Sequence, residues 1–251
     1  SCLPRMDFYL DTTVQGDPAL LDGEVYRNAL AQVAQRPFRM VPYYDPGVWG
    51  GDWMKDTFEL PENGSNYAWS FDGVPEENSL LLGFGSVTVE TPAINLVFSQ
   101  PRALLGDRVH ARFGTEFPIR FDMLDTIHGQ NLSLQVHPLT EYIQDTFNMR
   151  YTQDESYYIL DTEEEEGTVW LGVKEGAVPE EVEQALRDAQ TGAKPFDAAR
   201  YVNCFPVKKH DHVLIPAGTI HGSGAGTMVL EISATPYIFT FKLWDWGRVD
   251  L

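Results

Sequence analysis

The stretch that decides the fold reads Asn131-Leu132-Ser133-Leu134-Gln135-Val136-His137-Pro138. In a β-strand, successive side chains point to opposite faces, so Ser133, Gln135 and His137 share one face while the leucines and the valine enter a core. Pro138 cannot donate to a sheet ladder, so it ends the strand or begins its turn. The polar face therefore offers an amide oxygen and an imidazole two residues apart, and both are potential metal ligands.

The composition is that of a folded globular protein with a strong negative charge. The chain has 251 residues, of which 43% are hydrophobic, enough for one large β domain or two small ones. The 37 acidic and 18 basic residues give a formal net charge of -19, which argues against nucleic acid or an anionic membrane as a partner. The same charge would repel a phosphorylated substrate unless positive side chains gather locally.

The cysteine content and the hydropathy pattern indicate a cytoplasmic protein. Cys2 and Cys204 lie far apart in sequence and form no C-x-x-C pair, which argues against a disulfide framework and against a thiolate zinc site. No apolar run approaches the roughly 20 residues that span a bilayer, and the first residues do not form a signal peptide.

Local patterns predict one helix near the start, followed by many short strands. Asp17 is a plausible N-cap and Pro18 suits the first position of a helix over 17–36, in which four apolar residues recur at a spacing of four: Leu21, Val25, Ala29 and Val33. From Phe38 to about Gln100, short apolar or aromatic runs alternate with Gly, Pro, Asn and Asp. This texture is typical of a sandwich or a barrel.

The second half of the chain also reads as strands, with one clear helix. Phe117–Phe121 and the opening stretch predict a hairpin, and Val213–His221 with Met228–Ile232 predicts a second. Pro179–Gln190 has the helix signals, with Pro179 at its start, two glutamates in its first turn and a glycine just past its end. Residues 140–151 are ambiguous between helix and loop, and Tyr237–Leu243 is expected to be the last strand. We therefore predict a partly helical N-terminal extension over 1–40 and a β domain over 41–251 with a helical insertion near 179–191.

Two further residues are candidate metal ligands. Glu155 leads directly into an apolar strand, where a carboxylate is poorly placed without a partner, and His221 ends the turn that follows Pro216. Catalytic zinc takes nitrogen and oxygen ligands from separate strands and keeps one position open for water or substrate. For each residue the alternative is a structural role, as a hydrogen-bonded histidine or an exposed acid.

Five short motifs together resemble the type I mannose-6-phosphate isomerases in their order and approximate spacing: Phe117–Asp125, Leu132–Pro138, Glu155–Leu160, Pro216–His221 and Leu243–Arg248. Val48-Trp49-Gly50-Gly51 is similar to the Trp-Gly-Gly signature near the start of that family. The resemblance covers about residues 42 to 250.

The resemblance implies a cupin, a double-stranded β-helix of the jelly-roll kind, with one zinc ion held by Gln135, His137, Glu155 and His221. It also implies interconversion of mannose 6-phosphate and fructose 6-phosphate through a cis-enediol. Arg248 matches the catalytic arginine of the family and would stabilise the enediolate, although an ion pair with Asp245 would suit its position equally well. The general base stays open between Glu231 and a zinc-bound water.

The chain departs from the family pattern in three ways, and these departures leave alternative functions open. The chain has Gln153 where the family has a lysine two residues before the metal-binding glutamate, and it has Ile232–Pro236 where the family reads Gln-x-Ser-Asp. Family members usually continue into a second cupin, so further domains of a longer chain are expected partners, beside a small sugar or sugar phosphate. The alternative function is a metal-containing cupin that binds sugar or regulates and has lost isomerase activity. A jelly roll without a metal is a third reading.

Overall fold

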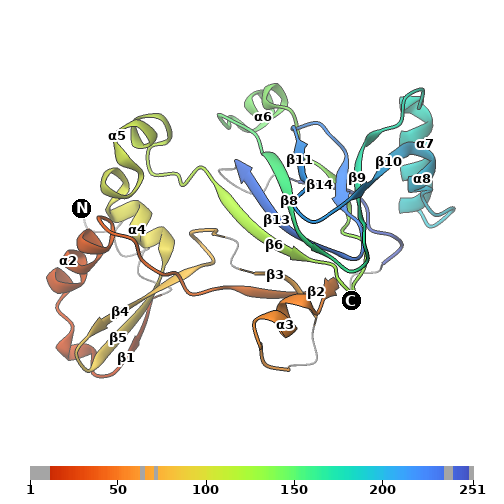
Figure 1. Cartoon of the computed structure of the whole chain (residues 1–251). Coiled ribbons are helices and arrows are strands. Elements are labelled where there is room, and N and C mark those ends of the chain that lie inside the picture. Colours follow the sequence, from red (N-terminus) through yellow and green to blue (C-terminus); the bar gives the residue numbers. More distant parts are fainter. Residues whose placement is uncertain (1–11, 63–65, 71–72, 235–239, 249–251) are drawn as a thin grey trace. The chain divides into compact units, whose positions relative to one another are not determined.

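The computed structural model of the chain describes residues 12–62, 66–70, 73–234 and 240–248, and it divides into two compact units (Figure 1). The N-terminal unit combines Ser1–Tyr43 with Phe71–Ile119, and the sandwich unit combines Tyr44–Ser70 with Arg120–Leu251. The sequence did not suggest that residues 71–119 group with the N-terminal residues. The predicted boundary near residue 40 stays a prediction about domains.

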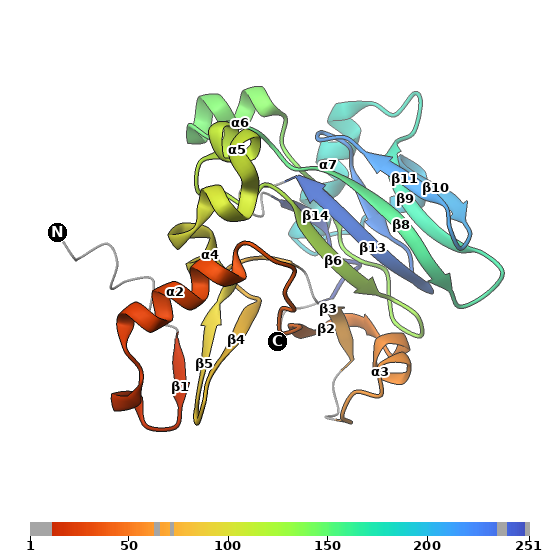
Figure 2. The same cartoon turned by 60° about the vertical axis from the view of Figure 1, so that its left-hand side comes forward.

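The N-terminal unit is a small sheet packed against helices. Its three antiparallel strands stand in the order β1 (Thr13–Gln15), β5 (Val87–Pro92) and β4 (Ser79–Phe84). Figure 2 shows α2 (Gly23–Val33) running beside this sheet, and α4 (Ala93–Ser99) and α5 (Pro101–Phe113) follow β5 in the chain. The core combines residues of the helices and the sheet: Tyr26, Leu30, Val33, Leu80, Val89 and Leu96.

The first helix begins later than the sequence predicted. Asp17 caps a single 3-10 turn, and Asp22 caps α2 by accepting a hydrogen bond from the backbone N–H of Glu24 at 2.6 Å. The buried face of α2 contains Tyr26, Leu30 and Val33, whereas Val25 is 49% exposed. Because an α-helix has 3.6 residues per turn, residues spaced by four do not all lie on one face of it. The predicted apolar face was therefore wrong at Val25.

The sandwich unit contains two antiparallel sheets. One has the order β11 (His212–Ile215), β8 (Asp154–Thr162), β13 (Thr227–Ala234), β6 (Arg120–Asp125), β3 (Tyr67–Ser70) and β2 (Tyr44–Gly51). The other has the order β10 (Val202–Val207), β9 (Gly167–Val173), β12 (His221–Ser223), β7 (Leu134–Val136) and β14 (Phe241–Trp244). One core cluster joins Ile159 and Val229 of the first sheet to Val169 and Val207 of the second. The predicted class, a mainly β jelly roll of the cupin kind, is confirmed.

From β6 onward the chain crosses repeatedly from one sheet to the other. β6, β8, β11 and β13 lie in the six-stranded sheet, and β7, β9, β10, β12 and β14 lie in the five-stranded sheet. Both predicted hairpins were therefore wrong: β6 and β7 stand in different sheets, and β8 separates β11 from β13. Hydrophobic alternation indicates which face of a strand is buried, but it does not indicate which other strand pairs with it.

Among its described residues, the sandwich unit also contains four helices: α3 (Trp53–Thr57), α6 (Thr140–Phe147), α7 (Pro179–Gln190) and α8 (Ala198–Tyr201). The predicted helix over Pro179–Gln190 is present, and its Val182 packs with Leu134 of β7. The ambiguous stretch after Pro138 forms α6. The start of the last predicted strand, at Tyr237, lies outside the described residues, and β14 begins at Phe241.

Candidate metal centre

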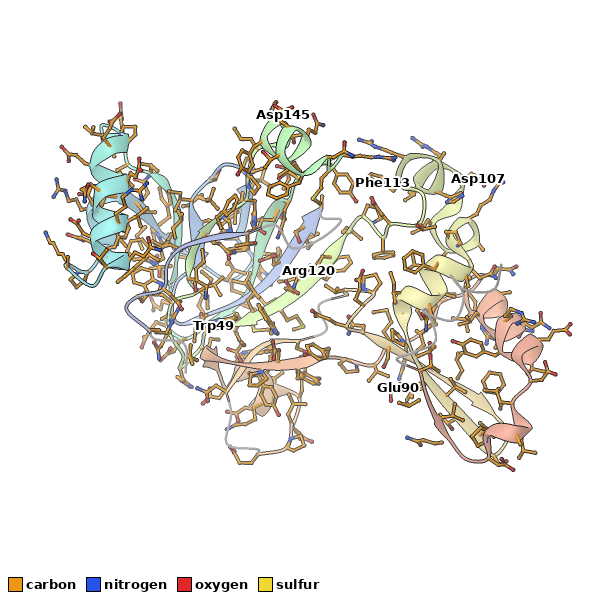
Figure 3. All side chains as sticks on the ribbon, turned by 180° about the vertical axis from the view of Figure 1, so that it is seen from behind. Trp49, Glu90, Asp107, Phe113, Arg120 and Asp145 are labelled. Carbon is orange, nitrogen blue, oxygen red and sulfur yellow. The ribbon has the colours of Figure 1, made fainter. Side chains whose placement is uncertain are left out.

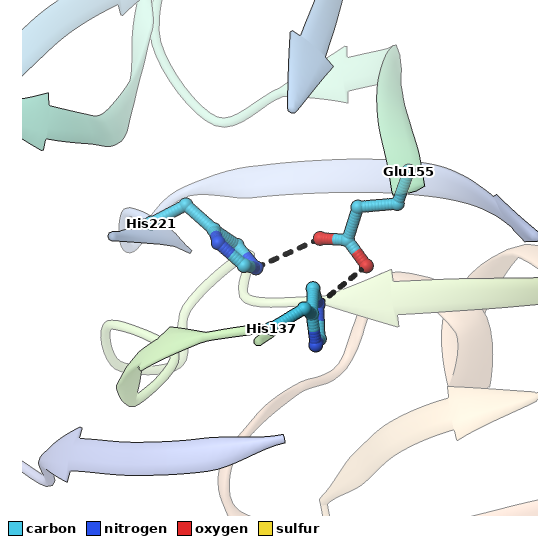
Figure 4. A group of neighbouring side chains, drawn as sticks. All are labelled: His137, Glu155 and His221. Carbon is cyan, nitrogen blue, oxygen red and sulfur yellow. Dashed lines mark hydrogen bonds and ion pairs between the residues drawn. The ribbon is translucent and has the colours of Figure 1, made fainter. Parts of the chain in front are cut away.

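Three buried side chains meet where the two sheets of the sandwich unit face each other (Figure 4). His137 follows β7 directly and His221 begins β12, while Glu155 comes from β8 in the opposite sheet. The Nε2 atom of His137 lies 3.0 Å from Oε2 of Glu155, and Nε2 of His221 lies 2.8 Å from Oε1. One ligand atom from each residue falls within 4.8 Å of the other two.

Gln135 completes the group that the sequence predicted. It pairs with His221 in the sheet register, and its Nε2 atom lies 3.2 Å from Nε2 of His221. The two ends of a side-chain amide are exchanged by a flip that leaves the heavy-atom positions almost unchanged, so the amide oxygen can occupy the same place. All four predicted ligands are thus brought together, and their metal-binding role stays a prediction.

The orientation of the His221 ring suits a metal ligand. Nδ1 of His221 lies 2.8 Å from the carbonyl oxygen of Thr219, which can only accept a hydrogen bond, so Nδ1 carries a proton and Nε2 is the ring atom that faces the rest of the group. Nε2 lies 2.8 Å from Oε1 of Glu155, which is buried. An imidazole nitrogen and a carboxylate oxygen this close can share a proton or bind one cation together.

The carboxyl group of Glu155 is suited to bind that cation. Burial alone would raise its pKa, but hydrogen bonds and charge from His137 and His221 outweigh burial and hold the pKa below its usual range. Gln153 also donates from Nε2 to Oε2 of Glu155 at 3.2 Å. The side chain has no exposed surface. An ionised carboxylate, two imidazoles and an amide form the nitrogen and oxygen set that zinc takes in catalytic sites, so the residues present fit the metal.

Glu231 lies close to this group. It stands on β13 opposite Tyr157 of β8 and Asp122 of β6. Burial raises the pKa of Glu231 well above its ordinary value, and the negative charges of Glu155 and Asp122 raise it further. The shift favours the protonated form of this carboxyl. A protonated acid beside a proposed metal ligand can donate a proton, and it can act as a base only after losing one.

Arg248 is engaged in an ion pair, the alternative that the sequence left open. Its Nε and Nη2 atoms donate to Oδ1 of Asp245, and Nη1 donates to the carbonyl oxygen of Asn131 at 2.7 Å. Asp245 also accepts a hydrogen bond of 2.5 Å from the hydroxyl of Ser133, which shares the polar face with Gln135 and His137 in the predicted strand. The catalytic role of Arg248 stays a prediction.

Three further residues lie near the site. Thr240 lies with its hydroxyl 3.2 Å from Nδ1 of His137, the ring atom that faces away from Glu155. Lys242 stands opposite Gln135 in the sheet, and Arg120 forms a buried ion pair of 3.0 Å with Asp122. The sequence pattern could have indicated that Arg120 and Asp122 are buried, because they alternate along the strand with the same period that places Leu124 in the core.

The comparisons with known proteins agree with this fold. Mannose-6-phosphate isomerase ManA of Bacillus subtilis (strain 168) is 24% identical over 220 residues, which cover 85% of this chain and 62% of the relative. The crystal structure of the mannose 6-phosphate isomerase from Bacillus subtilis superimposes with a TM-score of 0.64 at 20% identity, covering 84% of this chain and 62% of that one. A zinc-bound mannose 6-phosphate isomerase structure superimposes with a TM-score of 0.57 at 14% identity, over 81% and 69% of the two chains.

The fold and the site define a cupin with a buried His-Glu-His group. Together with the relatives, they confirm the predicted resemblance: the chain is related to the mannose-6-phosphate isomerases. It spans 62% of the length of the Bacillus relative. No model of a protein family matches it. Among the described residues, no helix combines the length and the apolar character that crossing a membrane requires.

Proposed function

We propose that the chain is a metal-dependent aldose–ketose isomerase, acting on a small sugar or sugar phosphate as the mannose-6-phosphate isomerases do. The observation that carries the proposal is the convergence of potential ligand atoms from His137, Glu155 and His221 at one buried point. The names of the relatives supply the reaction class, which is isomerisation of mannose 6-phosphate. The resemblance found in the sequence implies fructose 6-phosphate as the product and a cis-enediol as the intermediate.

Zinc is the metal we propose, held by Gln135, His137, Glu155 and His221. The donor set supports it, and so does the zinc-bound structure of similar fold. When bound, the ion would supply positive charge that polarises the carbonyl and hydroxyl oxygens of the sugar. The expected cytoplasmic location belongs to this proposal as well, and the presence of only two cysteines supports it.

The remaining chemistry falls to side chains of this unit. Glu231 would hold the proton that moves between the two neighbouring carbons of the sugar, since burial and the negative charge of Glu155 raise the pKa of its carboxyl and favour the protonated form. Arg248 would stabilise the negative charge of the enediolate, after exchanging Asp245 for the substrate oxygen. Lys242, opposite Gln135, is a second cation on the strand next to the site.

Metal content and turnover test the proposal together. Purified protein should contain about one zinc ion per chain, and a coupled assay should detect fructose 6-phosphate formed from mannose 6-phosphate. His221→Ala should lose both the metal and the turnover, because it removes one of two imidazole ligands. His212→Ala is the matched control: this histidine is exposed on β11, and its removal should change neither.

The outcomes separate the two functions that the sequence left open. A metal-loaded protein that converts neither mannose 6-phosphate nor mannose would be a sugar-binding or regulatory cupin, the alternative reading. A protein that retains no metal after expression with zinc, and gains none on titration, would contradict the metal centre itself.

A further inference from the structure

Two rows of polar residues cross the six-stranded sheet beside the metal centre. Strand register aligns Glu155 of β8 with Ser233 of β13 and Arg120 of β6. Two positions further along the strands, the same register aligns three more polar residues: Tyr157, Glu231 and Asp122. The next row is apolar and belongs to the core: Ile159, Val229 and Leu124. The six polar side chains therefore run from the proposed ligand Glu155 to the edge of the hydrophobic core, and we call them the polar rows.

Every member of the polar rows is buried. The most exposed of them, Glu155, is 6% exposed, and Tyr157 is completely buried. Figure 3 labels Arg120 on its β6 ribbon, and its guanidinium is within 3.0 Å of Asp122. Charged and hydroxyl side chains at such positions are costly unless they are paired, so a row of them implies a purpose other than packing.

Three donors in the polar rows are left without partners. Within the described part of the chain, the Tyr157 hydroxyl, the Ser233 hydroxyl and Nε of Arg120 make no hydrogen bond, although each lies in the interior. Buried polar atoms are rarely unpaired in native proteins. The Tyr157 ring packs in the core and meets the His221 ring edge-on, at 6.1 Å between centroids. Packing accounts for the ring, but a phenylalanine would pack equally well, so it does not account for the hydroxyl.

We propose that Ser233, Tyr157 and Arg120 form a subsite for the hydroxyl groups of an open-chain sugar bound at the metal centre. Ser233 is the direct cross-strand neighbour of Glu155, so the subsite adjoins the proposed metal position. Each sugar hydroxyl can both donate and accept a hydrogen bond. The subsite offers partners for both, because two hydroxyl groups and a guanidinium alternate with carboxyl groups. A phosphate only accepts hydrogen bonds and carries negative charge, so the carboxyl groups of Asp122 and Glu155 would disfavour it. The subsite thus takes the hydroxyl-bearing carbons, and the phosphate end of a phosphorylated sugar would lie away from it.

The inference rests on the proposed function, but its test does not require turnover. Mannitol, a linear polyol that cannot isomerise, is the probe, and its binding to the zinc-loaded full chain is measured by calorimetry. Tyr157→Phe and Ser233→Ala each delete a single oxygen. Each should weaken mannitol binding by about tenfold, the loss typical of one hydrogen-bonded contact. Each should also raise the melting temperature by about 2 to 4 °C in the absence of ligand, because an unpaired buried hydroxyl is removed.

Tyr158→Phe is the matched control. The Tyr158 hydroxyl contacts Nδ1 of His210 at 2.8 Å, on the opposite face of the same strand. This variant should leave mannitol binding unchanged and should gain no stability.

The two readouts distinguish a ligand subsite from a structural role. Unchanged affinity together with a lower melting temperature in Tyr157→Phe would mean that the hydroxyl stabilises the fold, and it would overturn the proposal. Absence of mannitol binding to the metal-loaded wild type would overturn it as well. Mannitol binding that depends on Tyr157 and Ser233, without turnover of any sugar, would support the subsite and refute the isomerase function.

Discussion

Replacing Arg248 by alanine tests whether this residue acts on substrate or only holds the fold. The structure sets the cost of the change. Arg248 makes two contacts with Asp245 and one with the Asn131 carbonyl, and the two side chains of the pair are 11% and 18% exposed. Removing one partner of this partly buried pair costs about 3 kcal/mol at most, which is the low end of the range for fully buried pairs. For a chain of this size, that lowers the melting temperature by about 6 to 12 °C.

The catalytic effect is expected to be larger than this stability effect can explain. Loss of a group that stabilises developing negative charge typically lowers kcat by about 10²- to 10³-fold. Turnover should therefore be measured well below the melting temperature of the variant and expressed per metal-loaded, folded molecule. Bound zinc should be retained, because Arg248 contacts none of the four proposed ligands directly: its hydrogen bonds go to Asp245 and Asn131.

Asp245→Asn is the matched control, because it weakens the same ion pair and leaves the guanidinium in place. If Arg248 acts on substrate, this variant should lose stability like Arg248→Ala while keeping turnover within about tenfold of the wild type. If the pair is only structural, both variants should turn over normally once the folded fraction is taken into account. Normal turnover by folded Arg248→Ala would remove the residue from the mechanism.

Three further predictions concern the surroundings of the site. Burial raises the pKa of Asp125 to about 6 from 3.8, so its protonated form is favoured in the folded state, and the unfolding free energy should fall by about 3 kcal/mol as the pH rises from about 3 to about 7. Chemical denaturation across this range checks the fall, and Asp125→Asn should lack this part of it. Gly51→Ala should lower the stability of the folded protein by about 1 to 3 kcal/mol, because the new Cβ would lie 2.1 Å from the carbonyl oxygen of Ile127. Gly83→Ala is the control, because a Cβ at that position meets nothing within 4 Å. Equal melting temperatures of the two variants would contradict the prediction. Gln153→Ala should weaken zinc binding by about tenfold, because it removes a hydrogen bond of 3.2 Å to the carboxylate of Glu155, a proposed zinc ligand. A competition titration with a chelator measures the affinity. An unchanged affinity would count against Glu155 as a ligand.

The sequence predicted the strands better than it predicted their neighbours. Alternation placed Leu132 and Leu134 in the interior, and both are buried. It gave no information about which sheet each strand joins, because a crossing jelly-roll strand and a hairpin strand have the same period of two. Helix positions were sound where end signals were strong, as at Pro179, and were displaced where two aspartates competed to cap the first helix.

The four proposed metal ligands came from a resemblance, and spacing alone could not have assembled them. Gln135 and His221 are 86 positions apart in sequence and become neighbours only because β7 and β12 pair. Glu155 reaches the same point from the facing sheet. The protonation argument at His221 was inaccessible from sequence, since it depends on the Thr219 carbonyl that fixes the proton on Nδ1.

The proposed sugar subsite in the polar rows is compatible with the acidic charge of the chain. Three acidic groups, Asp122, Glu155 and Glu231, gather inside the sandwich, and their mutual repulsion is relieved in three different ways. Arg120 pairs with Asp122, the two histidines hold Glu155 ionised, and Glu231 takes up a proton. A neutral, hydroxyl-rich ligand can enter this arrangement without adding charge to it. A phosphate could not, so any phosphate on the substrate must be recognised elsewhere, and Lys242 on the neighbouring strand is the first position to test.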